Sequence, residues 1–125
     1  MPMLTYQRWK AGKVESGESR QTIRARRRRP VKVGDALYHY ANARTPAMCR
    51  LRADQNDVCV ETFAVVIRRA DSYCDVFLRG SEEPAAPDEV EDLARRDGFE
   101  SAAEMTDWLL SAYGPVMFEG DVIRW

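Results

Sequence analysis

The sequence has no long hydrophobic run and no leader-like start. No apolar stretch of its 125 residues approaches the roughly 18 to 20 residues that a membrane-spanning helix needs. The first ten residues also lack the basic-then-apolar pattern of a secretory signal. Because 45% of the residues are hydrophobic and 31% are charged, the composition is typical of a globular protein. We therefore expect a single domain over residues 1–125, located in the cytoplasm and with no membrane partner.

Cysteine and histidine are scarce. The three cysteines, Cys49, Cys59 and Cys74, form no C-x-x-C pair, and His39 is the single histidine. A zinc site needs more ligands than this at close spacing, and a disulfide framework needs an even number of cysteines. We therefore expect no metal and no cofactor, with the cysteines reduced and His39 playing a structural role within a strand.

The net charge of −1 hides a strong separation of charge along the chain. Residues 1–34 contain ten Lys or Arg and two Asp or Glu, whereas residues 80–125 contain three and twelve. Four consecutive arginines, Arg26 to Arg29, are followed by Pro30, which indicates an exposed loop. A basic block of this kind meets either phosphate or an acidic surface of its own fold. The sequence alone leaves both alternatives open.

Apolar and β-branched residues predict a series of short strands. We expect strands over residues 4–6, 21–24, 36–41, 48–53, 59–68 and 73–78, and a weak helix or irregular segment over 7–16 that ends at Gly17. The polar residues 54–57 predict a hairpin turn between the fourth and fifth of these strands. On the strand over 21–24, Thr22 and Arg24 share one face because successive side chains point to opposite sides.

Two acidic helices are predicted after residue 80. The first has Asp88 as its cap and ends near Gly98, which suits a left-handed position. The second begins with a capping box at residues 101–104. Residues 116–125 return as one or two strands around a turn at residues 119–120. This order predicts an α+β fold in which a small antiparallel or mixed sheet curls into a β-barrel, with the helices packed at one side.

Several strings of residues resemble a known family. Residues 15–24 (ESGESRQTIR), followed by residues 32–38 (KVGDALY), resemble the T-I-R and G-D-x-L patterns of the ASCH family, small barrel domains related to PUA RNA-binding modules. Residues 92–99 (DLARRDGF) and the segment from Trp108 to Trp125 are similar to its acidic-helix and closing-strand signatures. The resemblance implies a PUA-like β-barrel with a cleft between the T-I-R strand and the acidic helices, where RNA or a nucleoside would bind.

The resemblance also implies a set of site residues. Characterised relatives include an amidohydrolase that removes the acetyl group from 4-acetylcytidine, and others with ribonuclease activity. By this resemblance the catalytic threonine falls on Thr22, the acidic residue on Asp97 and the lysine on Ser19. A serine supplies no positive charge to activate the threonine or to hold an oxyanion. Either Arg20 or Arg24 takes the electrostatic role, or the site keeps binding without catalysis.

These observations support one main function and two alternatives. The main one is binding of RNA or a nucleoside in a basic cleft, through Ser19, Arg20, Arg24, Arg26, Arg27, Arg28, Arg29, Lys32, Tyr38 and Tyr40. The first alternative is a hydrolase of a modified nucleoside or RNA, with Thr22 as the nucleophile or water-orienting group, Asp97 as the general base and Arg24 stabilising negative charge. The second is a protein-interaction module that uses acidic residues 82–107. We expect a monomer or a weak homo-oligomer.

Overall fold

The computed structural model describes residues 2–125, which form two β-sheets flanked by helices. The first sheet contains β1 (Met3–Tyr6), β3 (Tyr38–Ala41) and β4 (Cys49–Leu51), in the order β1-β3-β4 with β1 parallel to β3. The second sheet is antiparallel, in the order β2-β7-β5-β6, and contains β2 (Gln21–Ala25), β7 (Met117–Arg124), β5 (Glu61–Arg69) and β6 (Cys74–Leu78). The helices are α1 (Arg8–Ser16), α2 (Pro87–Arg96) and α3 (Ala102–Tyr113). The α+β prediction is confirmed.

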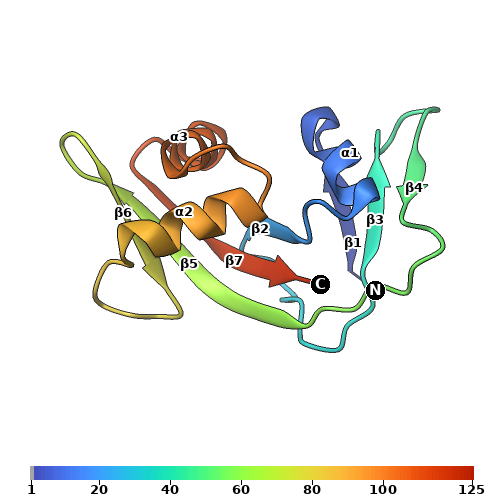
Figure 1. Cartoon of the computed structure of the whole chain (residues 1–125), viewed down its shortest axis with the longest axis horizontal. Helices are drawn as coiled ribbons and strands as arrows, with labels where there is room; N and C mark the ends of the chain where they lie inside the picture. Colours follow the sequence, from blue (N-terminus) through green and yellow to red (C-terminus); the bar gives the residue numbers. More distant parts are fainter. Residues whose placement is uncertain (1) are drawn as a thin grey trace.

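Each sheet has its own helices and its own core. Figure 1 shows α2 and α3 grouped over the second sheet, while α1 lies beside the first. Under α2 and α3 the core includes the fully buried Ile67, Leu93 and Leu109. Under α1 a second core forms around residues such as Leu4, and it also takes in the end of β7 and Trp125. The C-terminal end of β7 therefore joins the two halves of the molecule.

The predicted hairpin between the fourth and fifth strands is wrong. β4 pairs with β3, whereas β5 pairs with β6 and β7 in the other sheet. The segment between β4 and β5 crosses from one sheet to the other, and hydrogen bonds of Asp57 hold it in place. The Asp57 carboxylate accepts hydrogen bonds from Arg52 Nε at 2.6 Å and Nη2 at 3.2 Å, and its carbonyl accepts one from Leu37 N at 2.9 Å. The polar residues are thus a crossing connection and not a tight turn.

The predicted turn at residues 119–120 is also wrong. β7 runs without a break from Met117 to Arg124 and pairs with β2 on one side and β5 on the other. Gly120 is needed there for close packing. A Cβ at this position would lie 2.2 Å from the carbonyl oxygen of Arg24 and 2.6 Å from the ring of Phe118. The glycine therefore permits close strand contact, which sequence analysis mistook for a turn.

The helix ends agree with the sequence in part. Ser101 caps α3 as predicted, because its Oγ accepts a hydrogen bond from Glu104 N at 3.1 Å. Asp88 is not the cap of α2: Ala86 occupies that position and Pro87 begins the helix. A proline fits there because the first helical residue has no carbonyl partner for its N–H. Gly98 follows the helix at φ +95°, in the left-handed region as predicted.

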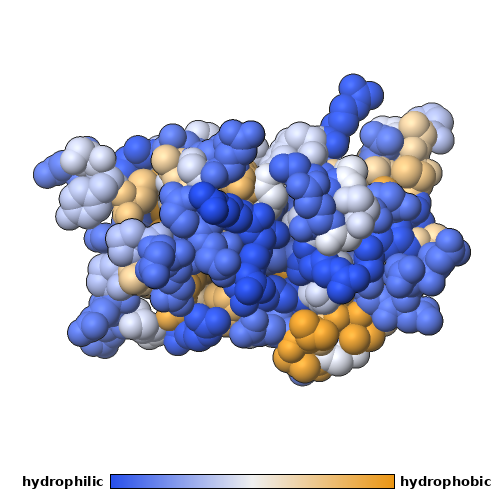
Figure 2. Space-filling view, viewed as in Figure 1, coloured by the Kyte–Doolittle hydropathy of each residue, from blue (hydrophilic) through white to orange (hydrophobic). Residues whose placement is uncertain are grey.

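The surface is largely hydrophilic on the face shown in Figure 2, with one apolar patch at its lower edge. This edge holds the loop before β3 and the start of β5 in the matching view of Figure 1. The exposed valines of these segments are Val33, Val58 and Val60. Within residues 2–125, no helix combines the length and the hydropathy that crossing a bilayer requires.

Candidate functional site

A cleft of about 330 Å³ opens between the two halves of the molecule. Its walls come from β1, α1, β2, the segment after β3, and the end of α2 with α3. The lining residues are Thr5, Tyr6, Gln7, Trp9, Lys10, Thr22, Ile23, Arg24, Asn42, Ala43, Asp97, Phe99, Trp108, Leu109 and Tyr113. The cleft thus lies between the strand of residues 21–25 and the acidic helices, where the family resemblance expects one.

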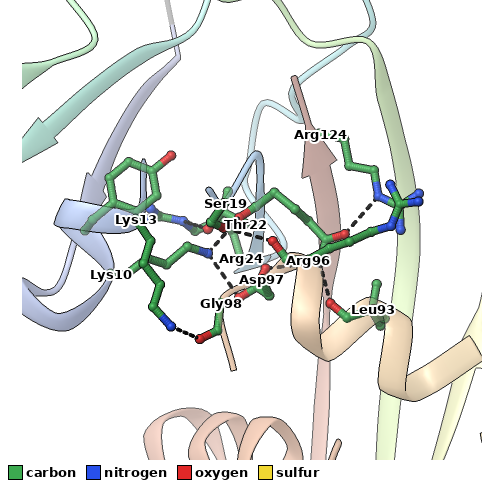
Figure 3. Close-up of polar contacts among 12 residues, drawn as sticks. Lys10, Lys13, Ser19, Thr22, Arg24, Leu93, Arg96, Asp97, Gly98 and Arg124 are labelled. Carbon is green, nitrogen blue, oxygen red and sulfur yellow. Dashed lines mark hydrogen bonds and ion pairs between the residues drawn. The ribbon is translucent and has the colours of Figure 1, made fainter. Parts of the chain in front are cut away.

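A buried ion pair forms the base of the cleft (Figure 3). Lys10 Nζ, from α1, lies 3.1 Å from Asp97 Oδ2 at the end of α2, and it donates a hydrogen bond to the Gln21 carbonyl at 2.7 Å. The two side chains are each only 6% exposed. Burial lowers the pKa of Lys10, while the charge of Asp97 and its hydrogen bond act in the opposite direction. The pair therefore brings a lysine and a carboxylate into a site with little solvent.

The position of Asp97 is fixed by contacts between the end of α2 and the early part of the chain. Gln21 Nε2 donates to Asp97 Oδ1 at 3.2 Å and to the Leu93 carbonyl at 3.0 Å. Lys13 Nζ donates to the Gly98 carbonyl at 2.7 Å. The last carbonyls of a helix have no partner within the helix and carry partial negative charge, so lysines and amide groups stabilise this end. The Asp97 carboxylate is therefore held by a hydrogen-bond network between residues that lie far apart in the sequence.

Thr22 and Arg24 face the cleft from the same side of β2, as the strand alternation predicts. Arg24 Nε donates to Thr22 Oγ1 at 3.0 Å, and Arg24 Nη2 donates to the carbonyl of Thr5 on β1. The guanidinium also lies 5.0 Å from the centre of the Tyr6 ring. Arg24 is therefore held in place by neutral groups, and the partner of Asp97 is Lys10.

Aromatic side chains line the wall of the cleft that belongs to α1 and α3. The ring of Trp9 lies 5.0 Å from that of Phe99 and 6.5 Å from that of Trp108, measured between centroids. Tyr113 continues the row, 6.4 Å from Trp108. Trp9 is 39% exposed and Tyr113 is 50% exposed, so both present ring surface to the solvent. The cleft thus has an aromatic surface as well as polar groups.

The structure brings Thr22, Arg24 and Asp97 together around one cleft, and it separates other predicted site residues from them. Ser19 is buried and donates a hydrogen bond to the Arg96 carbonyl at 2.9 Å. Arg20 is exposed and does not line the cleft. A serine in this position therefore stabilises the helix end and does not supply the function of a lysine.

The predicted stacking tyrosines lie on β3 and do not line the cleft. Tyr38 is half-buried beneath Arg50, whose guanidinium lies 5.0 Å from its ring centre. Tyr40 is also half-buried, and neither tyrosine is among the lining residues. The aromatic surface of the cleft comes instead largely from α1 and α3.

The arginine run forms a second hollow of about 590 Å³. It is lined by Pro2, Arg27, Arg28, Arg29, Pro30, Lys32 and Asp35. Arg26 points elsewhere, with Nη2 3.7 Å from Asp121 Oδ1 on β7. Among residues 2–125, the other three arginines of the run form no ion pair with a carboxylate. Within residues 2–125, the arginine run therefore does not form ion pairs with the acidic helices.

Lys10 and Trp9 are the cleft residues that sequence reasoning missed. The helix over residues 7–16 was expected to be weak, and Trp9 and Val14 were its apolar points. Lys10 lies one turn before Val14, on the same buried side of α1. A lysine in line with a buried valine at i and i+4 was the available signal, because a buried lysine requires a partner.

His39 belongs to a separate buried network beside the cleft. Tyr6 Oη and His39 Nδ1 are 2.7 Å apart, and His39 Nε2 lies 3.1 Å from Asp57 Oδ2. Burial lowers the pKa of His39 to about 4, against the raising effect of Asp57, so the ring is neutral near pH 7. Tyr6 connects this network to the cleft, since its ring lies under Arg24.

The cleft offers hydrogen-bond donors, one carboxylate and aromatic surface in a volume suited to a small organic group. Residues 2–125 place no three His, Cys, Asp or Glu side chains in a metal-binding arrangement. Comparison with known proteins identifies no relative: no family model, no curated protein and no solved structure matches this chain.

Proposed function

We propose that the cleft binds the base of a nucleoside or of an RNA strand. The observation that carries this proposal is that one cleft combines aromatic rings with Thr22, Arg24 and the Lys10–Asp97 pair. Proteins recognise unpaired bases by stacking them on aromatic rings and by hydrogen bonds to their edges. The volume of about 330 Å³ is at the lower end of small-molecule sites, which suits one base and its sugar.

The polar groups match the edge of a base. Arg24 and Lys10 donate, and Asp97 accepts, so both carbonyl and amino groups of a base would find partners. Thr22 can do both through its hydroxyl group.

The place of the cleft also supports the proposed relation to the ASCH family. It lies between the T-I-R strand, residues 22–24, and the helices of the acidic segment, as that resemblance implies. On this proposal the two sheets correspond to the two sides of a curled PUA-like barrel, connected through the end of β7.

Tryptophan fluorescence provides the first test, because Trp9 is partly exposed in the cleft. We expect ribonucleosides, or short single-stranded RNA, to change this fluorescence in a saturable way. Tyr113→Ala should weaken binding about tenfold, which corresponds to the loss of about 1.4 kcal/mol of stacking. Tyr73→Ala is the matched control, since Tyr73 is similarly exposed but lies outside the cleft. Absence of binding by all four ribonucleosides and by RNA would refute the proposal.

Hydrolysis at the same cleft is a second candidate, favoured by one specific observation. The resemblance places a lysine at the position that Ser19 occupies in this chain. Lys10 would supply that positive charge instead, because it reaches Asp97 from α1. Thr22 would attack the amide carbonyl of a substrate such as 4-acetylcytidine, with Asp97 taking its proton. Lys10 and Arg24 would stabilise the oxyanion. The C–N bond then breaks, the amine leaves with a proton, and water hydrolyses the ester on Thr22 to release acetate.

Product analysis distinguishes hydrolysis from binding alone. Incubation with 4-acetylcytidine should release cytidine and acetate in equal amounts, and Thr22→Val should abolish this release while preserving the shape of the side chain. Thr62→Val is the control, because Thr62 is a half-buried threonine on β5 that does not line the cleft. If neither 4-acetylcytidine nor labelled RNA is cleaved at high protein concentration, binding is the function that is left.

The alternative of a docking face at residues 82–107 stays a prediction. Several acidic side chains of this segment already contact arginines of the same chain: Glu89 with Arg79, Asp92 with Arg96, and Asp107 with Arg69. These exposed pairs are weak, but they reduce the free negative charge. We therefore give the cleft precedence.

A further inference from the structure

We infer that Arg24 and Arg27 form a phosphate site at the mouth of the cleft, so that the ligand is a nucleotide unit carrying phosphate and not a neutral nucleoside. This inference rests on the proposed function, because it assigns the base to the cleft. It goes further by naming the group that the ligand carries next to its base, and the residues that hold it.

Hydrogen bonds anchor both arginines to one strand, β1. Arg24 Nη2 donates to the carbonyl of Thr5, and Arg27 Nη2 donates to the carbonyl of Met3 at 2.8 Å. Thr5 and Met3 are two residues apart on β1, so these carbonyls lie about 7 Å apart and point to the same side. The two guanidinium groups are therefore anchored at neighbouring points along the same strand edge.

Neither arginine has an acidic partner. Within residues 2–125, no carboxylate oxygen lies within ion-pair distance of Arg24 or Arg27, although most other buried or half-buried charges of the molecule are paired. Burial, and then the charge of Arg24, lowers the pKa of Arg27, which shows that the two positive charges affect each other. Two like charges held close without a counter-ion disfavour the empty state, and an anion between them would remove this cost.

The remaining donors fit phosphate. A guanidinium has five N–H groups, of which Arg24 uses Nε and Nη2 and Arg27 uses Nη2. The others are free to form the paired hydrogen bonds by which arginine binds phosphate oxygens. Arg24 also lines the cleft, so a phosphate held here would be one sugar away from a base stacked on the aromatic wall.

The second hollow continues from this site. Arg27 lines it together with Arg28, Arg29 and Lys32, and the segment of residues 2–5 extends from one hollow to the other, because Thr5 lines the first and Pro2 the second. The phosphate could thus belong to a free nucleotide or to an RNA strand that runs on into the second hollow. The chemistry at Arg24 and Arg27 is the same in both cases.

Isothermal titration calorimetry with matched probes tests the inference. The probes are the four ribonucleosides, their 5′- and 3′-monophosphates, inorganic phosphate, and 5′-phosphorylated tetranucleotides. For the preferred base, we expect one monophosphate to bind about tenfold tighter than the nucleoside, or more. Arg27→Gln should bring the ratio of the two affinities close to one, and Arg27→Lys should restore part of it.

Arg69→Gln is the matched control, because Arg69 also donates from its guanidinium to a backbone carbonyl, that of Pro115 at 3.1 Å, and does not line the cleft. It makes the same change in net charge and should leave the ratio unchanged. Equal affinity for nucleoside and monophosphates, or an equal effect of both substitutions, would overturn the inference. Phosphate binding that depends on Arg27 without any nucleoside binding would instead refute the proposed function and support the phosphate site.

The tetranucleotides identify the source of the phosphate. A strand that runs into the second hollow should bind more tightly than the mononucleotide, with a salt dependence steeper by about 0.7 in log–log slope for each additional phosphate contacted. Arg28→Gln and Lys32→Gln should reduce this additional slope. Equal affinity and equal slope for both probes would assign the site to a free nucleotide.

Discussion

Lys10 carries the positive charge that compensates for the buried Asp97 carboxylate in the cleft. Its ammonium and the Asp97 carboxylate compensate for each other in a place that excludes water, and the Gln21 carbonyl takes a further hydrogen bond from Lys10. A buried ion pair adds little over a well-packed apolar pair, but removing one partner leaves an uncompensated charge. The pair should therefore respond to mutation as a unit.

We expect Lys10→Met to lower the free energy of unfolding by about 3 kcal/mol or more, because Asp97 loses its buried counter-ion. Urea unfolding monitored by circular dichroism measures this change. Combined with Asp97→Asn, the loss should be smaller than the sum of the two single losses by about 1 kcal/mol or more. Additive losses would mean that the two groups do not stabilise each other.

His39 makes the stability of the fold depend on pH. The ring is 1% exposed, contacts Tyr6, Asp57 and Trp125, and has its pKa lowered from 6.5 to about 4, mainly by burial. Because the unfolded chain binds a proton at higher pH than the folded chain does, stability is complete above about pH 6.5 and is lost as the pH falls toward 4. The full loss is roughly 3 kcal/mol, at 1.36 kcal/mol per pKa unit.

Urea unfolding at a series of pH values from about 7.5 to about 5.5 checks this prediction above the range where carboxylates titrate. His39→Gln keeps a polar side chain of similar size but cannot take up a proton. The variant should be less stable at pH 7 and have a flatter profile over this window. Parallel profiles for the variant and the unmodified protein would show that another group carries the dependence.

At the scale of elements, the two glycines Gly120 and Gly12 give a matched pair. A Cβ on Gly120 would overlap the Arg24 carbonyl oxygen at 2.2 Å, whereas a Cβ on Gly12, in α1, would meet nothing within 4 Å. We expect Gly120→Ala to destabilise the protein by about 3 kcal/mol or more, because the clash is with backbone. Gly12→Ala should stabilise it by about 0.5 to 1 kcal/mol through helix propensity. Thermal unfolding of both variants measures the difference, and similar melting temperatures would contradict it.

Local signals predicted local structure. The alternation of residues 21–24 placed Thr22 and Arg24 on one face, and the capping box at Ser101 began α3 where expected, because both depend on neighbours within four residues. The partner of β4 was not predictable in this way. β4 pairs with β3, and the alternation of apolar and polar residues along a strand does not identify its neighbour.

At the scale of the whole molecule, the site depends on the meeting of two halves. The sequence indicated Asp97 by its resemblance to a family pattern, yet it could not show that Lys10 lies against it, since 87 positions separate them along the chain. The same packing removes Ser19 from the cleft and gives it a role at the end of α2. The groups that line the cleft are therefore brought together by tertiary contacts, which the sequence alone does not show.

The two sheets differ in the length of their strands, which predicts different free energies for local opening of their backbones. The first sheet has strands of four, four and three residues. The second has β5 with nine residues and β7 with eight, and these two pair over most of their length. Opening free energy rises with buried apolar contact and with the extent of a strand ladder. The first sheet should therefore open locally while the second stays folded.

Native-state amide exchange followed by NMR measures this difference at single residues. The hydrogen-bonded amides of β3, the central strand of the first sheet, should exchange about tenfold faster than those of β7 or more, equal to about 1.4 kcal/mol less in opening free energy. Their exchange should also depend less on added urea, because less surface is exposed when one sheet opens. Identical free energies and identical urea dependence for β3 and β7 would mean a single cooperative unit. Ile123 and Trp125, at the end of β7, enter the core of the first sheet. In a single cooperative unit, these contacts would have to stabilise the two halves against separation as strongly as the contacts within each half stabilise that half.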